Sequence, residues 1–165
     1  MKKTGIFYGS LTGTTAAVAE RIGALLGVPD QDIINVAEAS PVKLADYDLI
    51  VLGSSTWGDG ELEEDWFDFI DGASALDLSG KKVALFGCGD ETMSDTFCNA
   101  VGKLYEGLKG TGATFVGEFP ADGYTFAHSE ATDGKLMRGL VLDEVNHPDL
   151  TEGKVKAWTD ILKNS

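Results

Sequence analysis

The sequence predicts an α/β fold in which a parallel sheet lies between two layers of helices. Short apolar runs alternate along the chain with longer amphipathic segments, and no linker or low-complexity stretch interrupts the alternation. The chain has 165 residues, of which 43% are hydrophobic, and this is enough for one domain with a full core. Strands that alternate with helices favour parallel pairing, because each parallel connection needs a long crossover. We therefore expect residues 1–165 to form a single domain.

Five apolar runs are the expected strands, at residues 4–8, 32–36, 49–53, 82–86 and 114–119. Between them, apolar residues at helical spacing predict helices after residue 13, over about 62–70 and over about 97–108. Ser40 and Pro41 predict a brief helix to about Ala45, since proline suits the first helical position. A last helix is expected from about Thr151.

The segment 122–138 does not follow this alternation. It is weakly patterned, and residues 139–142 after it again have the composition of a strand. A long loop in a compact domain usually has its own packing or a function. We therefore interpret the segment as an ordered insertion that splits the fifth strand.

The net charge of −14 excludes several classes of partner. Nucleic acids and anionic membranes would be repelled, whereas proteins with basic faces would be attracted. No apolar stretch approaches the roughly 20 residues of a membrane span, and no signal peptide is recognisable. Cys88 and Cys98 lack metal-ligand spacing, and they are expected to be buried thiols in a cytoplasmic monomer.

The first functional signal is an uncharged loop of hydroxyl residues and glycines that leaves the first strand and enters a helix. It contains Ser10, Leu11, Thr12, Gly13, Thr14 and Thr15. A helix N-terminus with small residues before it favours a bound anion. The loop lacks the lysine of a nucleoside triphosphatase and the G-x-G-x-x-G of a dinucleotide fold. It therefore suits one terminal phosphate held by neutral donors.

Two further loops follow strands at the same expected edge of the sheet. Residues 54–61 include Trp57 beside Gly58, Asp59 and Gly60, and residues 87–94 include Gly89 and Asp90. Ligands of parallel α/β sheets bind beyond the carboxyl ends of the strands. A phosphate cradle beside an aromatic side chain, here a tryptophan placed in the loop after its strand, favours a mononucleotide with a planar ring.

These motifs resemble the flavodoxin family. The matching residues are Ser10-x-Thr12-Gly13-Thr14-Thr15, Thr56-Trp57-Gly58-Asp59-Gly60 and Gly87-x-Gly89-Asp90, and residues 122–143 resemble the insertion of long-chain flavodoxins. The resemblance implies a flavodoxin-like three-layer α/β/α sandwich. Its five-stranded parallel sheet would have the order 2-1-3-4-5, with the fifth strand split, and would hold non-covalent FMN.

The resemblance also implies roles for individual residues. Ser10, Thr12 and Thr15, with the backbone N–H groups of residues 11–15, would bind the FMN phosphate. Thr56 and Asp90 would contact the ribityl chain or ring edge, and Trp57 would stack on the dimethylbenzene side. Ser55, Cys88 and Gly89 are further expected cofactor-binding residues. The Gly58–Asp59 peptide would turn its carbonyl toward flavin N5. Met93 replaces the usual tyrosine on the outer face, and Cys98 lies near the expected pyrimidine edge.

The implied function is that of a low-potential one-electron carrier rather than an enzyme. The carrier would shuttle between semiquinone and hydroquinone, accepting electrons from a reductase and passing them to a redox enzyme. A carboxylate about 10 Å from the ring costs the reduced anion roughly 1.7 kcal/mol, and residues 59–71 are rich in such groups. The same acidic segment would dock partners with basic faces.

Two other functions compete with that of a carrier. An NAD(P)H-dependent FMN or quinone reductase of similar fold would need basic residues for the adenosine phosphates, which the acidic rim disfavours. A response-regulator receiver needs an aspartate at the end of the third strand, where this chain has Gly53-Ser54-Ser55. His128 and His147 are expected at the surface, away from the three loops.

Overall fold

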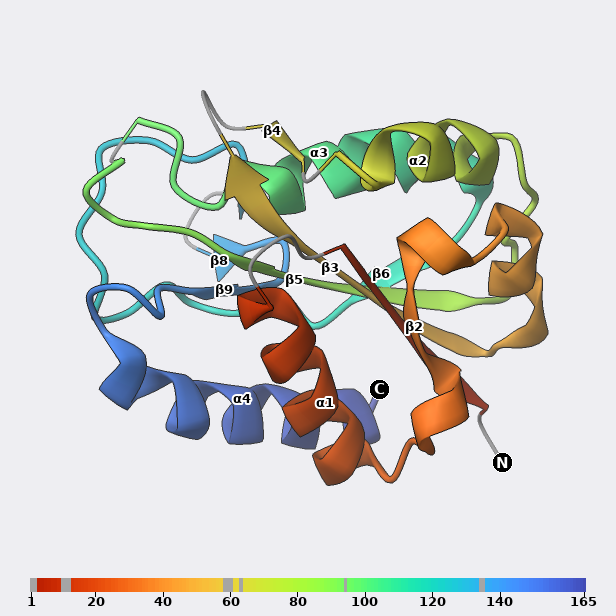
Figure 1. Ribbon diagram of the computed structural model, residues 1–165, viewed down its shortest axis with the longest axis horizontal. Helices are drawn as coiled ribbons and strands as arrows, with labels where there is room; N and C mark the ends of the chain where they lie inside the picture. Colours follow the sequence, from red (N-terminus) through yellow and green to blue (C-terminus); the bar gives the residue numbers. More distant parts are fainter. Residues whose placement is uncertain (1–2, 10–12, 58–60, 63, 94, 134–135) are drawn as a thin grey trace.

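The computed structural model describes residues 3–9, 13–57, 61–62, 64–93, 95–133 and 136–165. Its centre is a parallel sheet with the strand order β2-β1-β3-β5-β6, and β9 pairs with β5 beside the last residues of that strand (Figure 1). The strands are β1 Thr4–Gly9, β2 Ile33–Asn35, β3 Leu49–Trp57, β5 Lys82–Cys88, β6 Thr114–Val116 and β9 Leu140–Leu142. The predicted order is confirmed, with β5 as the fourth parallel strand and the fifth divided between β6 and β9.

Two layers of α-helices enclose this sheet. They are α1 Thr14–Leu26, α2 Trp66–Ser74, α3 Asn99–Leu108 and α4 Pro148–Lys163. In Figure 1, α1 and α4 lie on one face of the sheet, and α2 and α3 lie on the other. Short 3-10 helices occupy Asp30–Asp32, Val36–Glu38, Pro41–Asp46 and Lys109–Thr111. No helix in the described part of the chain is long and apolar enough to cross a bilayer.

The central strands are buried on both faces, which explains their almost continuous apolar sequence. Because successive side chains point to opposite faces, alternate residues of one strand enter two separate cores. Ile50 and Leu52 of β3 join the core that contains Trp66 of α2. Val51 of the same strand joins the core that contains Trp158 of α4. The packing of both cores holds the carboxyl ends of the central strands in position.

The split in the fifth strand begins where β6 ends. Gly117 has φ 84°, a left-handed conformation that favours glycine, and its carbonyl accepts a hydrogen bond from the Trp158 indole over 2.7 Å. The chain returns through a hairpin of β7 Thr132–Asp133 and β8 Leu136–Met137. Phe119 and Met137 exchange backbone hydrogen bonds of 3.1 and 2.9 Å. The described residues of the predicted insertion therefore pair with the chain that follows β6, and Tyr124, Ala131 and Met137 pack into the core that contains Trp66.

Several element bounds differ from the sequence prediction. The strand expected over 49–53 continues to Trp57, because residues 56 and 57 pair with the short antiparallel strand β4 Glu61–Leu62. Trp57 is thus a strand residue, and its assignment to the loop was wrong. The helix expected from Leu62 starts at Trp66, and the last helix starts at Pro148, before Thr151. The first two differences arise because residues 56–57 pair with residues 61–62, and the last helix begins at Pro148 because proline suits the first helical position.

Candidate functional site

The carboxyl ends of four strands meet at one edge of the sheet. The backbone register aligns Gly9 of β1 with Ser54 of β3, and Ser54 with Gly87 of β5. Gly87 in turn pairs with Val141 of β9. The three loops singled out in the sequence all leave the sheet at this edge, and so does a fourth loop, which connects β9 to α4. Their convergence follows from parallel pairing alone.

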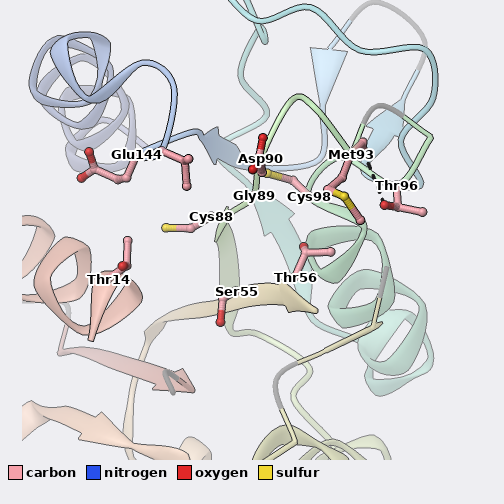
Figure 2. A pocket seen from close by; sticks show the side chains of 11 residues that line it. Thr14, Ser55, Thr56, Cys88, Gly89, Asp90, Met93, Thr96, Cys98 and Glu144 are labelled. Atoms are coloured by element: carbon pink, nitrogen blue, oxygen red, sulfur yellow. Dashed lines mark hydrogen bonds between the residues drawn. The ribbon is translucent and has the colours of Figure 1, made fainter. Parts of the chain in front are cut away.

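A cavity of about 290 Å³ lies at this edge (Figure 2). It brings together predicted residues from α1, β3, β5 and the segment between β5 and α3. The lining residues are Thr14, Ser55, Thr56, Cys88, Gly89, Asp90, Met93, Thr96, Cys98, Glu144 and Val145. Met93 is 52% exposed and Val145 is 70% exposed. The predicted residues in this list therefore share one pocket.

The start of α1 lies beside this cavity. Gly13, the residue before the helix, has φ 87° and carries no side chain that could cap the helix. A helix N-terminus favours anions, because its backbone N–H groups and the helix dipole both present positive charge. The hydroxyl oxygen of Thr15 is fully buried and has no hydrogen-bond partner among the described residues. An unpaired buried hydroxyl costs about 1–3 kcal/mol, so a ligand atom that pairs with it would be stabilising.

Cys98 and Gly89 form the tightly packed inner wall of the cavity. Cys98 is fully buried at φ 50°, and its Sγ lies 3.8 Å from the Gly87 carbonyl oxygen and 3.7 Å from that of Leu142. A Cβ at position 89 would meet Cys98 Sγ at 2.9 Å, which explains the glycine there. Burial raises the pKa of the Cys98 thiol well above its ordinary value and that of Cys88 to about 12. Both thiols are therefore neutral, and the expectation that they are buried is confirmed.

Asp90 is held by its own loop and by the fourth loop. Its Oδ1 accepts hydrogen bonds from the Thr92 backbone N–H at 2.9 Å, the Thr92 hydroxyl at 2.6 Å and the Asn146 amide at 2.7 Å. These bonds, those of Thr92 first, lower the pKa of the Asp90 carboxyl. On the opposite wall, the Thr56 hydroxyl accepts the Ala100 N–H at 3.2 Å, which ties β3 to α3. The polar side chains of the cavity are thus pre-positioned.

Part of the predicted site lies outside the described residues. These positions are Ser10, Leu11, Thr12, Gly58, Asp59 and Gly60. The backbone of Trp57 belongs to β3, and its side chain is outside the described part of the chain.

Comparisons with known proteins match almost the whole chain. A family model for flavodoxin matches residues 6–158. A flavodoxin of Synechococcus elongatus is 40% identical over 166 residues, which cover 99% of this chain and 98% of the relative. Flavodoxin 1 of Azotobacter vinelandii is 41% identical over 170 residues, with 99% and 97% covered. The chain belongs to the flavodoxin family.

The solved structures agree with this family assignment. The crystal structure of Fusobacterium nucleatum flavodoxin bound to flavin mononucleotide has a TM-score of 0.90 and 28% sequence identity. The match covers 99% of this chain and 98% of that one. The resemblance to flavodoxins and the flavodoxin-like fold inferred from the sequence are both confirmed.

Sequence reasoning missed three residues that line the cavity, namely Thr96, Glu144 and Val145. The last two lie in the loop after β9. The rule that identified the first three loops applies equally to a loop that follows residues 139–142, which were recognised as a strand. The same rule would therefore have identified this fourth wall of the flavodoxin-type pocket.

His147 was expected away from the three loops, and this was wrong. Its Nε2 lies 2.7 Å from Oε1 of Glu91, which belongs to the third loop. The two residues are 56 positions apart and are brought together by the pairing of β9 with β5. His128 lies elsewhere, beside a separate surface groove between α3 and the insertion.

Proposed function

We propose that this chain binds FMN without a covalent bond and carries single electrons between redox proteins. The observation that carries this proposal is the buried, unpaired hydroxyl of Thr15 in the first turn of α1, beside the cavity at the strand ends. Such a hydroxyl suits the phosphate of a mononucleotide, since a charged acceptor there would supply the missing hydrogen bond. Family membership and the FMN-bound neighbour support the same ligand.

We assign the phosphate end of FMN to the loop before α1 and to its first residues. Ser10, Thr12 and Thr15 would donate their hydroxyls, and the backbone of Leu11 to Thr15 would donate N–H groups. Hydrogen bonds to a charged acceptor are worth about 1.5–3 kcal/mol each, so several of them would dominate the affinity. This assignment uses neutral hydrogen-bond donors and includes no metal ion.

We assign the ring end to the three other walls. Ser55, Thr56 and Asp90 would orient the ribityl chain and the ring edge. Trp57 would cover one face of the flavin, and Met93 would replace an aromatic side chain on the other, since a thioether packs favourably on a ring. Cys88, Gly89 and Cys98 would form the apolar inner wall, and the Gly58–Asp59 peptide would present its carbonyl to N5.

Bound FMN would supply the one-electron chemistry, and the protein would tune it by charge. Asp90 and Glu144 line the cavity, and Asp90 is held ionised by hydrogen bonds that lower its pKa. Negative side chains disfavour further negative charge on a nearby group, by roughly 1.7 kcal/mol for one charge at about 10 Å. This effect favours a strongly reducing cofactor.

The partners we propose are a reductase and an acceptor enzyme with basic surfaces. Acidic residues gather at the start of α2, where Glu64, Asp65 and Asp68 line a shallow groove. Between Arg21 and Lys81, Lys43 is the one lysine or arginine in the sequence. A surface of one sign accelerates the encounter with an oppositely charged partner and weakens with salt.

Stepwise anaerobic reduction of the FMN-loaded protein, followed by absorbance, tests this function. A one-electron carrier should accumulate a long-wavelength band before the flavin bleaches completely. Failure to bind FMN at micromolar concentration, or direct bleaching in one two-electron step, would overturn the proposal. Oxidation of NADH by the loaded protein alone would indicate a reductase instead.

A further inference from the structure

Glu91 and His147 join the third loop to the start of α4. His147 Nε2 lies 2.7 Å from Glu91 Oε1, and the two side chains are 32% and 19% exposed. The other carboxylate oxygen of Glu91 accepts a hydrogen bond from the Thr125 backbone N–H at 2.7 Å. One carboxylate therefore connects the third loop, the insertion and the last helix.

A second carboxylate holds the backbone around this pair. Asp143 is fully buried, and its Oδ2 accepts hydrogen bonds of 2.9 Å from the Glu91 N–H and from the Asn146 amide. Its Oδ1 accepts the backbone N–H groups of Val145 and Asn146 at 3.0 and 2.9 Å. The Asp143 carbonyl accepts the His147 N–H at 3.1 Å. Asp143 thus anchors the backbone of the loop at Glu91. The ion pair between the Glu91 side chain and His147 is the part of this cluster that can change its charge near neutral pH.

The cluster lies directly behind two walls of the cavity. Asp90, next to Glu91, lines the cavity, and so do Glu144 and Val145, which precede His147 in the chain. We propose that His147, acting through Glu91, is a positioning residue that holds the 90–93 loop in the conformation that receives the flavin. This inference rests on the proposed FMN binding. It predicts that the protein binds FMN more tightly when His147 is charged.

The surroundings of His147 determine the direction of the effect. The hydrogen bond to Glu91 is the main cause that raises the pKa of His147 above its ordinary value of 6.5. Burial opposes this shift, while Asp143 and Asp149 reinforce it. The insertion places the Tyr124 ring 5.7 Å from the imidazole, and Lys154 of α4 lies 4.8 Å from that same ring. A raised pKa means that the contribution of the pair is complete below 6.5 and is lost as the pH rises through the raised value.

The test compares three conservative variants by FMN titration at about pH 6 and about pH 9. His147→Gln keeps a hydrogen-bond donor without the charge, and Glu91→Gln keeps an acceptor without the charge. His128→Gln makes the same chemical change beside a separate groove and is the matched control. Titration of the FMN phosphate affects all variants equally, so the affinities are compared at each pH with those of the control.

We expect His147→Gln and Glu91→Gln to bind FMN about threefold to fivefold more weakly than the control at the lower pH. All variants should bind alike at the higher pH, where the wild-type imidazole has lost its charge. NMR titration of the apoprotein should show the pKa of His147 falling toward 6.5 in the Glu91→Gln variant.

Equal affinities at both pH values, or a uniform loss at both, would overturn the inference while leaving the proposed function intact. An unchanged His147 titration in Glu91→Gln would overturn it as well. A wild-type chain that does not bind FMN would overturn the proposed function, and the inference with it.

Discussion

The α-carbon of Gly102 in α3 packs directly against the backbone carbonyl of Glu130 in the insertion. A Cβ at position 102 would lie 2.3 Å from the Glu130 oxygen, closer than any real contact. The Glu130 N–H also donates to Asn99 Oδ1 over 2.7 Å, and the Glu130 carboxylate lies 3.6 Å from Lys103 Nζ. One helix thus presents a glycine, an amide and a cation to the same residue. The two atoms nearest to a Cβ at position 102 belong to the backbone of Glu130. Rotation of a side chain therefore cannot make room for a larger residue at this position.

Gly102→Ala should therefore destabilise the protein by about 1–3 kcal/mol, because the methyl group forces a backbone shift. Gly153→Ala is the matched control, since position 153 lies inside α4 and a Cβ added there would have nothing within 4 Å. Alanine there should stabilise the helix by about 0.5–1 kcal/mol. Urea unfolding of the apoproteins measures both changes. Equal effects of the two substitutions would contradict the close packing of α3 on the insertion.

Thr15→Val should separate folding from FMN binding. The substitution removes a buried hydroxyl that has no hydrogen-bond partner among the described residues, so the apoprotein should be no less stable. FMN binding should weaken about 10-fold or more, because one phosphate hydrogen bond is lost. Flavin fluorescence quenching measures the affinity.

Thr151→Val is the control for this variant. Thr151 in α4 carries the same kind of fully buried hydroxyl without a described partner, but it lies near the start of α4 rather than in the first turn of α1. Its substitution should leave FMN affinity unchanged. If Thr15→Val also binds FMN normally, Thr15 has no role in holding the phosphate.

The two thiols should be protected from reagents by folding. Cys88 is 6% exposed and Cys98 is fully buried, and burial raises the pKa of Cys88 to about 12. The thiolate is the reactive form, so the native protein should react very slowly with a thiol reagent at about pH 8. Both cysteines should react rapidly in guanidinium chloride. Rapid modification of the native apoprotein would show that the inner wall of the cavity opens.

The same pKa shift predicts a pH dependence of stability. Because folding keeps the thiol neutral, its stabilising contribution is complete below the unfolded pKa of 9.0 and declines as the pH rises toward the folded value. The free energy of unfolding should therefore fall above about pH 9. Cys88→Ala should reduce this decline, and an unchanged pH profile in that variant would contradict the assignment.

Neutralising the acidic surface should slow electron transfer from a basic reductase. The triple variant Glu63→Gln, Glu64→Gln and Asp65→Asn removes three charges beside the predicted flavin edge, and Glu63 itself lies outside the described residues. At low salt the rate should fall about 10-fold, and its salt dependence should become weaker.

The control removes three charges on the opposite face of the sheet, through Glu20→Gln, Glu152→Gln and Asp160→Asn. These residues lie in α1 and α4, which cover the face away from α2 (Figure 1). If both triple variants slow the reaction equally, the net charge of the protein rather than a docking surface near α2 governs the encounter.

Some residues of the candidate site could be predicted from the sequence, and others could not. Thr14, Ser55 and Asp90 were placed correctly beside one cavity, because each follows or opens an element with a clear local pattern. Glu144 and Val145 were missed although the strand before their loop was recognised, because that loop contains neither the glycines nor the hydroxyl residues that drew attention to the other three. The contact of His147 with Glu91 was also missed. This contact depends on the pairing of β9 with β5, which follows the insertion and places the start of α4 beside the third loop.

The sequence by itself determined the parallel α/β architecture, the split fifth strand and the chemistry of the first three loops. Apolar periodicity, glycine positions and hydroxyl residues determine the local structure of a few neighbouring residues. These features can therefore be recognised in the sequence without knowledge of the fold. Only the tertiary structure decided that β3 extends to pair with β4, that Cys98 packs behind Gly89, and that Asp143 and His147 hold the third loop. Asp143 and His147, for example, reach the third loop because β9 pairs with β5. The physical reason is that register and packing between layers are properties of the whole sheet, and no single segment encodes them.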